Sequence, residues 1–337
     1  MADFRLRLEI LAESLVVEAK LNPLGLTMAH GQLVRAIRQR LELGALWQAA
    51  PDVLDTPLAP PVIVVGHMRS GTTRVHRLLA ADPALSATRF CDSWHPVPRS
   101  PDTRPAWSAL SLLFARALDP WLDSIHPFGA TRADEELGWL ATALDHCAYE
   151  AQWHIPSFTA FSEERDPAPV YREFVRMLQT DANWHANADR PRVLKVPQFA
   201  EDLPALLAQF PDARVVKTKR CPDETAASAA SLVANQMVLQ SDEVDFDWIT
   251  AEAARKISLR QNRMEAALSR FTGPLAEVDF VALDSDWETE TRRIYAALGM
   301  SLSSQALVAM RGEQGRAVAS PHTAHGQQLR EFSETTA

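Results

Sequence analysis

The segment PPVIVVGHMRSGTTRVHRLLAADP, residues 60–83, places two glycines five residues apart and follows them with two threonines. Hydroxyls, backbone N–H groups and the guanidinium of Arg69 are groups that bind anions. In a Walker A loop, G-x-x-x-x-G-K-[ST], a lysine follows the second glycine and reaches the nucleotide phosphates. Here Thr72 takes the place of that lysine, and the cation stands two residues before Gly71. The spacing predicts an anion-binding loop, but not one for a magnesium-bound nucleoside triphosphate.

Two elements must hold this loop in place. The β-branched run at 62–65 is typical of a strand that is buried on both faces of a parallel sheet. Val75, Leu78 and Leu79 recur at helical spacing and predict a helix that begins near the second glycine. The N–H groups of residues 70–73 would then point into the loop, where the helix dipole favours a dianion.

A second anion signal follows a later strand, ARVVKTKR, at 213–220. Arg220 closes this strand, and Ser228 lies eight residues on, two turns into the small-residue helix DETAASAASLVANQ. A guanidinium and a hydroxyl in this arrangement could grip one phosphate. The chain therefore carries two candidate anion sites.

The rest of the pattern predicts an α/β fold. Strands expected at 62–65, 192–196, 213–220 and 278–284 alternate with helices, which favours a mainly parallel central sheet in a P-loop-like three-layer α/β/α arrangement with inserted helices. We expect a helical N-terminal segment at 1–55 and one main domain at 56–337. A helical insertion at about 92–189, on the substrate side, is expected to contain long helices at 133–151 and 169–185.

Composition excludes several classes of protein. The chain has 337 residues, 47% of them hydrophobic, and a net charge of −9 from 34 basic and 43 acidic residues. This balance provides no broad basic field for nucleic acid or an anionic membrane. The odd number of widely spaced cysteines, three, predicts neither a disulfide framework nor a zinc site and favours a reducing cytoplasm. We expect no signal peptide and no membrane span.

Both motifs resemble those of one enzyme family. GHMRSGTTRVHRLLAADP resembles the 5′-phosphosulfate loop of sulfotransferases that use 3′-phosphoadenosine 5′-phosphosulfate (PAPS), and RCPDETAAS resembles their 3′-phosphate motif. The stretches RVLKVPQFAEDLPALLAQFPDARVV and FVALDSDWETETRRIYAALGM are also similar to that family, most of all to its bacterial branch. The resemblance covers residues from about 55 to 330.

The resemblance implies transfer of a sulfuryl group from PAPS to a hydroxyl or amine of a small-molecule acceptor, without a metal. Sulfuryl transfer mainly requires in-line positioning and stabilisation of charge on the leaving oxygen. The residues that the resemblance assigns to the donor are Arg69, Ser70, Gly71, Thr72, Thr73, Arg220 and Ser228. Lys195 closes a neighbouring strand and is expected to point at the same centre.

The catalytic base is less clearly marked. Many relatives have a histidine shortly after the lysine, but this chain reads Lys195-Val-Pro-Gln-Phe. Asp92, in FCDSWHPVP, aligns with a carboxylate used by other relatives, and we expect it to be the base, with His95 as its competitor. Glu135 and Glu136 are further candidates on the substrate side.

The C-terminal part and the insertion suggest how the site is completed. Relatives close a basic, glycine-containing loop over the nucleotide, and Arg311, Gly312 and Arg316 are our candidates for it, ahead of His322 and His325. Tryptophans gather in the insertion and favour an apolar alcohol or phenol as acceptor.

Two other functions remain open at this stage. One is a P-loop kinase, against which the missing lysine argues. The other is a nucleotide-binding member of the fold without catalytic activity. The sequence indicates neither the identity of the acceptor nor the oligomeric state.

Overall fold

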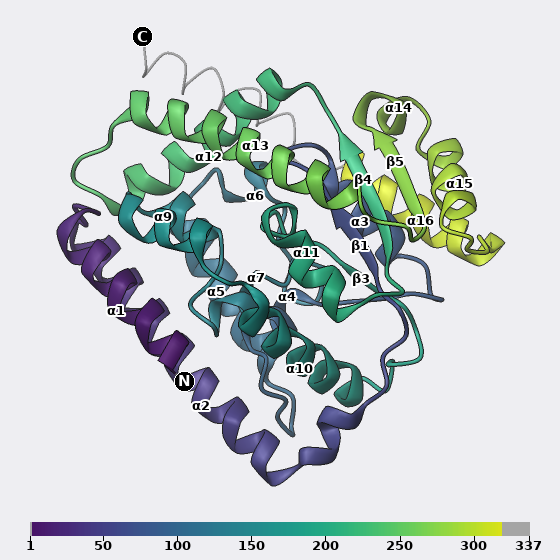
Figure 1. Cartoon of the computed structure of the whole chain (residues 1–337), viewed down its shortest axis with the longest axis horizontal. Coiled ribbons are helices and arrows are strands. Elements are labelled where there is room, and N and C mark those ends of the chain that lie inside the picture. The colour runs from purple at the N-terminus through teal and green to yellow at the C-terminus, as the bar shows by residue number, and fades with distance from the viewer. Residues whose placement is uncertain (1, 319–337) are drawn as a thin grey trace.

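A computed structural model of the chain describes residues 2–318. Within this range the centre of the molecule is a five-stranded sheet of order β2-β3-β1-β4-β5, in which every neighbouring pair is parallel (Figure 1). The strands are β1 (Val62–Val65), β2 (Ser86–Ala87), β3 (Arg192–Leu194), β4 (Arg214–Lys219) and β5 (Leu275–Asp279). The predicted α/β fold with a mainly parallel sheet is confirmed.

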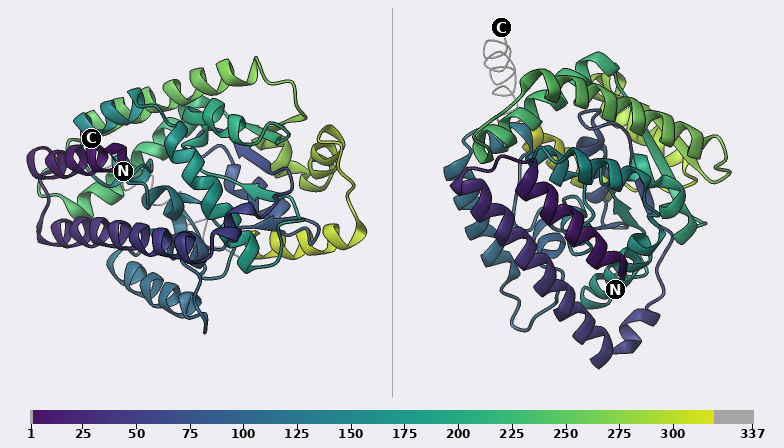
Figure 2. Two further views of the ribbon diagram at one scale, coloured as in Figure 1. Left: turned by 60° about the horizontal axis from the view of Figure 1, so that its bottom comes forward. Right: turned by 60° about the vertical axis from the view of Figure 1, so that its left-hand side comes forward.

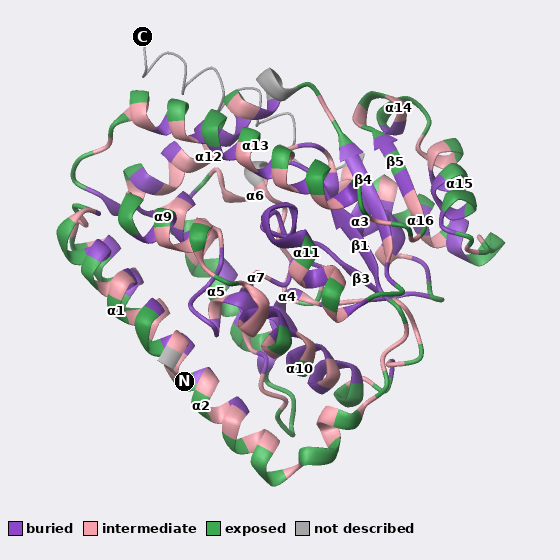
Figure 3. Ribbon diagram, viewed as in Figure 1, coloured by how far each residue is buried: buried purple, intermediate pink, exposed green. Residues whose placement is uncertain are grey.

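Helices cover both faces of this sheet. Ile63 and Val65 point into a core shared with α10 (Ala168–Trp184), α11 (Phe199–Gln209) and α13 (Phe246–Leu268). Val62 and Val64 point to the opposite face, where α3 (Thr72–Ala80), α15 (Trp287–Ala297) and α16 (Ser304–Val318) pack. Apolar side chains on alternate faces of one strand thus build the predicted three layers. Figure 3 shows the central strands buried and the outer helix faces exposed.

The last strand differs from its prediction. The strand expected at 278–284 is wrongly placed along the chain, because β5 ends at Asp279 and α14 (Phe280–Ser285) follows directly. Asp279 caps this helix by accepting hydrogen bonds from the N–H groups of Val281 and Ala282. The capping aspartate overrides the β-branched and aromatic residues that suggested a strand.

The N-terminal segment is helical, as predicted, with α1 (Ala2–Val17), α2 (Pro23–Ala49) and the 3₁₀ turn η1 (Pro51–Asp55). Figure 2 shows α1 and α2 side by side along one flank of the molecule. Leu11 and Leu15 share a core with Tyr149, Trp153 and Phe158 of the insertion. These helices therefore pack mainly on the inserted helices, and Leu43 near the end of α2 joins the core beside the sheet.

The insertion is more broken than expected. Its helices are α4 (Phe90–Trp94), α5 (Arg104–Leu118), α6 (Leu122–Ile125), α7 (Leu137–Ala141), α8 (Ala148–Gln152), α9 (Pro156–Glu164) and α10. The long helix predicted at 133–151 is wrong, because α7 and α8 are separated by a turn in which Leu144 has a φ of +53°. A leucine in this left-handed region ends a helix. The helix predicted at 169–185 is confirmed as α10.

α12 (Pro222–Gln240) follows β4 and completes the layer beside α13. Within residues 2–318, no helix combines the length and the apolar character that crossing a bilayer requires.

Candidate active site

The loop between β1 and α3 depends on its two glycines. A Cβ atom on Gly66 would lie 2.0 Å from Thr218 Oγ1 of the neighbouring strand β4. Gly71 has a φ of +88°, and a Cβ atom there would lie 2.5 Å from Cδ2 of Phe280. The first glycine allows two strand ends to approach closely, and the second supplies a left-handed turn into α3.

The backbone of this loop has the form expected for anion binding. Arg69 also has a positive φ, +69°, so that left-handed residues lie on both sides of Ser70. Such alternation turns successive N–H groups into one concavity, and the first N–H groups of a helix have no acceptor within the helix. The N–H groups of Thr72 and Thr73 stand in this first turn of α3.

Ser70 has a different place from the one predicted. Its side chain is fully buried, and its Oγ lies 2.7 Å from the carbonyl oxygen of His67 and 2.6 Å from Thr218 Oγ1. Its N–H donates to the same carbonyl at 3.1 Å. Ser70 therefore fastens the loop to β4, whereas Gly71, Thr72 and Thr73 line the cavity beside it.

The two predicted anion motifs converge. Arg69 Nε donates to Ser228 Oγ at 2.8 Å, and an Nη atom of Arg220 donates to the carbonyl oxygen of Arg69 at 3.1 Å. Arg220 also lies over the ring of Phe280, with its Cζ 4.5 Å from the ring centroid. Burial, together with the nearby charge of Arg220, lowers the pKa of Arg69 to about 10. Two neighbouring guanidiniums stay positive more easily when an anion lies between them.

Lys195 stands next to the same loop. It follows the last residue of β3, and its Nζ lies 3.1 Å from Thr73 Oγ1. Lys195 also forms an ion pair with Glu135, while its backbone N–H donates to Glu136 Oε2 at 2.9 Å. Its ammonium group is thus fixed at the first turn of α3, as the position at the carboxyl end of a strand predicted.

A cavity of about 690 Å³ opens at the carboxyl ends of the strands, beside these residues. One side of it holds Arg69, Thr73, Lys195 and Arg220. The apolar and aromatic residues that line it include Leu78, Trp94, Leu122, Pro127, Phe128, Leu137, Ala148, Ala151, Leu232 and Phe280. The cavity therefore has a cationic wall next to a largely apolar remainder, which suits a phosphorylated ligand beside an apolar one.

Glu135 and Glu136 have different surroundings. Glu135 lines the cavity with its carboxylate against Lys195. Glu136 has no exposed surface, and burial raises its pKa to about 8, against the lowering effect of hydrogen bonds from Lys195 and Thr88. Only Glu135 of this pair faces the cavity, and Glu136 anchors the end of β3.

Sequence reasoning missed His126 and Asp134, which also line the cavity. His126 Nε2 lies 3.0 Å from Asp134 Oδ1, and His126 Nδ1 lies 4.0 Å from Glu135 Oε1. No spacing in the sequence marks this group, because His126 follows α6 and the two acids follow an irregular loop. The one signal available in the sequence was the acidic pair Glu135 and Glu136 before a helical pattern.

The structure places Asp92 away from this cavity. Its carboxylate receives hydrogen bonds from Arg89 at 2.6 and 2.9 Å, and Arg104 lies 3.2 Å from it. Burial alone would raise the pKa of Asp92, but His185 and the two arginines lower it far below its ordinary value. A buried carboxylate held by two arginines is a poor proton acceptor. Its ion pairs, and its absence from the described residues that line the cavity, argue against the expected role as base. The sequence does not reveal which way a side chain points.

His95 does not replace Asp92. Neither residue is among the described residues that line the cavity, whereas Trp94 between them is. Burial, with the charges of Arg35, Arg104 and Arg99, lowers the pKa of His95 to about 4.

Ligand atoms of Asp92, Asp181 and His185 lie within 4.8 Å of one another, in an arrangement that could hold a cation. Arg89 and Arg104 pair with Asp92, and Arg192 pairs with Asp181 at 2.7 Å. These arginines already neutralise the carboxylates, so this group is an ion-pair network.

The expected C-terminal loop is a helix. Arg311, Gly312 and Arg316 lie on the exposed face of α16, where Arg311 pairs with Glu288 and Arg316 with Glu313, both at 2.8 Å. The cavity is lined instead by Glu313, Gln314 and Ala317 of the same helix. The three predicted residues therefore do not reach the cavity here, because helical periodicity turns them outward. His322 and His325 lie outside the described residues.

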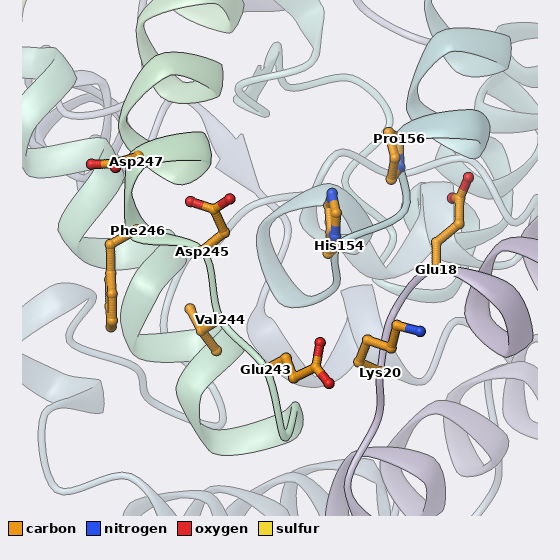
Figure 4. Close-up of a pocket in the computed structure, with 9 residues that line it drawn as sticks. All are labelled: Glu18, Lys20, His154, Pro156, Glu243, Val244, Asp245, Phe246 and Asp247. Atoms are coloured by element: carbon orange, nitrogen blue, oxygen red, sulfur yellow. The ribbon is translucent and has the colours of Figure 1, made fainter.

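A second pocket, of about 830 Å³, lies between the end of α1 and the start of α13 (Figure 4). Its lining includes the acids Glu18, Glu243, Asp245 and Asp247 and one cation, Lys20. Among the described residues the two pockets have no lining residue in common. This excess of negative charge disfavours a polyanion, so the donor is not expected there.

The central strand of the parallel sheet is followed by a loop of the anion-binding type, and a cavity lies at the carboxyl ends of the strands. These two features define an α/β protein with its ligand site at the sheet edge. A family model described as the sulfotransferase family matches residues 60–304, and the chain belongs to that family. Its catalytic class is therefore that of the sulfotransferases.

Solved structures support this assignment. The sulfotransferase STF1 from Mycobacterium tuberculosis H37Rv is 28% identical, with a TM-score of 0.85 over 99% of this chain and 92% of its own. The sulfotransferase STF9 from Mycobacterium avium, at 23% identity, shares the fold, with a TM-score of 0.81 over 93% of this chain and 82% of its own. The resemblance to the bacterial branch is thereby confirmed. A search of curated protein sequences found no significant match.

Proposed function

We propose that this protein transfers the sulfuryl group of PAPS to the hydroxyl of an apolar small molecule by in-line displacement. The observation that carries the proposal is the meeting of Arg69, Arg220 and Ser228, of which the two arginines line the cavity. Both phosphate-bearing ends of the donor need cations, and a protein with a net charge of −9 must supply them locally.

The loop between β1 and α3 binds the 5′-phosphosulfate in this proposal. The N–H groups at the start of α3 and the guanidinium of Arg69 surround a position suited to the 5′-phosphate. Lys195 and Thr73 lie beside it and are placed to stabilise the charge that develops on the leaving oxygen. Arg220 and Ser228 hold the 3′-phosphate, with Phe280 forming the adjoining wall.

Glu135 is the base in this proposal. It is the carboxylate that lies against Lys195 and also lines the cavity, so a hydroxyl bound opposite the loop comes within its reach. The ion pair with Lys195 holds the carboxylate in place before the acceptor arrives. As the sulfuryl group leaves the donor, Lys195 turns its charge to the leaving oxygen and Glu135 takes the proton.

The acceptor is an uncharged alcohol or phenol. Trp94, Leu122, Phe128 and Leu137 also line the cavity, and aromatic and aliphatic walls bind flat or extended apolar molecules. A sugar would leave many of its hydroxyls without partners against such walls, which is costly.

The test is turnover of PAPS with a panel of phenols, long-chain alcohols and sugars, followed as release of the product 3′-phosphoadenosine 5′-phosphate. We expect turnover with apolar acceptors and its loss in Glu135→Gln, while exposed Glu9→Gln on α1 serves as the matched control. Phosphoryl transfer from magnesium–ATP would indicate a kinase instead. Binding of the bisphosphate without turnover of any acceptor would indicate a non-catalytic member of the fold.

A further inference from the structure

His126 occupies a defined place at the side of the cavity. It follows the last residue of α6, and its imidazole lies against Phe128, with ring centroids 4.5 Å apart. The side chain is 17% exposed, so it reaches the cavity while remaining mostly enclosed. Packing against an aromatic ring holds the imidazole in one orientation.

Asp134 fixes which nitrogen of His126 carries the hydrogen. The two are joined by the 3.0 Å contact between His126 Nε2 and Asp134 Oδ1, and the same oxygen accepts the N–H of Glu135 at 2.8 Å. Burial alone would raise the pKa of Asp134, but His126 and Arg77 lower it to about 2. An ionised carboxylate accepts only, so Nε2 of His126 is the donor and Nδ1 of the neutral ring keeps its lone pair.

This lone pair faces the base. Nδ1 of His126 lies 4.0 Å from Glu135 Oε1, and both atoms are hydrogen-bond acceptors when His126 is neutral and Glu135 is ionised. Two acceptors do not hydrogen-bond to each other until a proton is placed between them. The 4.0 Å separation exceeds hydrogen-bond distance, so passage of a proton between the two groups requires their side chains to approach by about 1 Å.

We propose that His126, oriented by Asp134, receives the proton that Glu135 removes from the acceptor hydroxyl. The acceptor O–H bond breaks and its oxygen forms a bond to sulfur, while the bond from sulfur to the bridging oxygen of PAPS breaks. The proton passes from the hydroxyl to Glu135 Oε1 and on to Nδ1 of His126, and it leaves to solvent after the products depart. Glu135 is then again ionised beside Lys195. This inference rests on the proposed function.

The charges around His126 suit this role. Two carboxylates, those of Asp134 and Glu135, lie near the imidazole, and Arg77 Nη2 lies 3.5 Å from its Nε2. Arg77 is engaged with the carbonyl oxygen of Pro127 at 2.7 Å. Lys195 pairs with Glu135, and Arg132 pairs with Glu313. Asp134 acts through His126 and is a positioning residue.

The test compares His126→Ala and His126→Gln with His95→Ala, a histidine of the insertion outside the cavity. Turnover of PAPS is measured from pH 5 to pH 9 with and without added imidazole, and affinity for 3′-phosphoadenosine 5′-phosphate is measured by calorimetry. We expect both His126 variants to bind the bisphosphate within about twofold of wild type but to lose at least about tenfold in kcat, since acid–base groups contribute roughly 10²–10⁴-fold. The pH profile of kcat should differ between wild type and both His126 variants.

Imidazole should restore part of the turnover of His126→Ala, whereas His95→Ala should need no rescue. Wild-type kcat and an unchanged pH profile in both His126 variants would overturn the inference and leave the proposed function standing. Equal loss of bisphosphate affinity and kcat, without imidazole rescue, would also overturn it by showing a structural role. Failure of the wild-type protein to turn over PAPS with any acceptor of the panel would overturn both proposals.

Discussion

Arg69 Nε and Ser228 Oγ are 2.8 Å apart, although 159 residues separate them in the chain. The contact joins the loop after β1 to the second turn of α12, and Arg220 reaches the same loop through the carbonyl oxygen of Arg69. Parallel pairing of β1 with β4 brings the two motifs to one edge of the sheet. In the proposed function each motif holds one phosphate, and their meeting is what favours a ligand with two.

Replacement of Arg220 should weaken binding of 3′-phosphoadenosine 5′-phosphate. Loss of a charge-assisted hydrogen bond costs about 1.5–3 kcal/mol, which is roughly 10–100-fold in affinity. Calorimetry on Arg220→Ala should show this loss. Arg311→Ala is the matched control, because Arg311 lies on the exposed face of α16 and should leave affinity unchanged. Equal losses in both variants would mean that the donor site includes that face of α16.

Gly71→Ala should damage the loop. An alanine at a φ of +88° is strained by about 1–2 kcal/mol, and its Cβ would meet the ring of Phe280. We expect a lower Tm together with weaker binding of the bisphosphate. Gly44→Ala, within α2 and with nothing near its Cβ, should instead stabilise the protein by about 0.5–1 kcal/mol. A Gly71→Ala variant with wild-type Tm and affinity would contradict this view of the loop.

Asp92→Asn should act on stability and not on chemistry. Removing the charge leaves Arg89 and Arg104 partly unpaired, and breaking a buried ion pair costs about 3–5 kcal/mol. Urea unfolding should show the loss, while kcat of the folded enzyme stays near wild type. Asp123→Asn, in a more exposed pair with Arg116, should cost no more than about 1 kcal/mol. An unchanged unfolding midpoint with kcat reduced more than about 100-fold would return the role of base to Asp92.

Glu136→Gln should change the pH dependence of stability. The folded state raises the pKa of Glu136 to about 8 from an ordinary value of 4.5, so the folded protein binds the extra proton. The stability that this proton provides is present at low pH and is lost as pH rises between these two values. The variant should therefore gain stability relative to wild type over this window, measured by urea unfolding at pH 5, 7 and 8.5. The stability of exposed Glu13→Gln should have the same pH dependence as that of wild type. The same pH dependence in Glu136→Gln would contradict the assignment.

The sequence predicted the elements whose signals are local. The buried run of β1, the two-glycine loop and the Arg220–Ser228 spacing each depend on neighbours in the chain, and the structure brings the loop and the Arg220–Ser228 motif together. Lys195 was found for the same reason, because strand ends in a parallel sheet meet at one edge. The contact roles of these residues with a donor stay predictions.

The acceptor side was harder to predict. The positions of Glu135 and His126 depend on how α6, α7 and the loop before α7 pack, and no periodicity encodes that packing. The ion pairs of Asp92 could not be predicted, because its partners Arg104 and His185 are 12 and 93 residues away in the chain. Tertiary contacts of this kind override a motif that is read from spacing alone.

The most direct test of the central claim is calorimetric titration of the purified protein with 3′-phosphoadenosine 5′-phosphate in the absence of metal, with magnesium–ATP as comparison. The account predicts binding of the bisphosphate without metal, much tighter than that of magnesium–ATP, and its loss in the double variant Arg69→Ala, Arg220→Ala. Preference for magnesium–ATP, or wild-type affinity in that double variant, would contradict it.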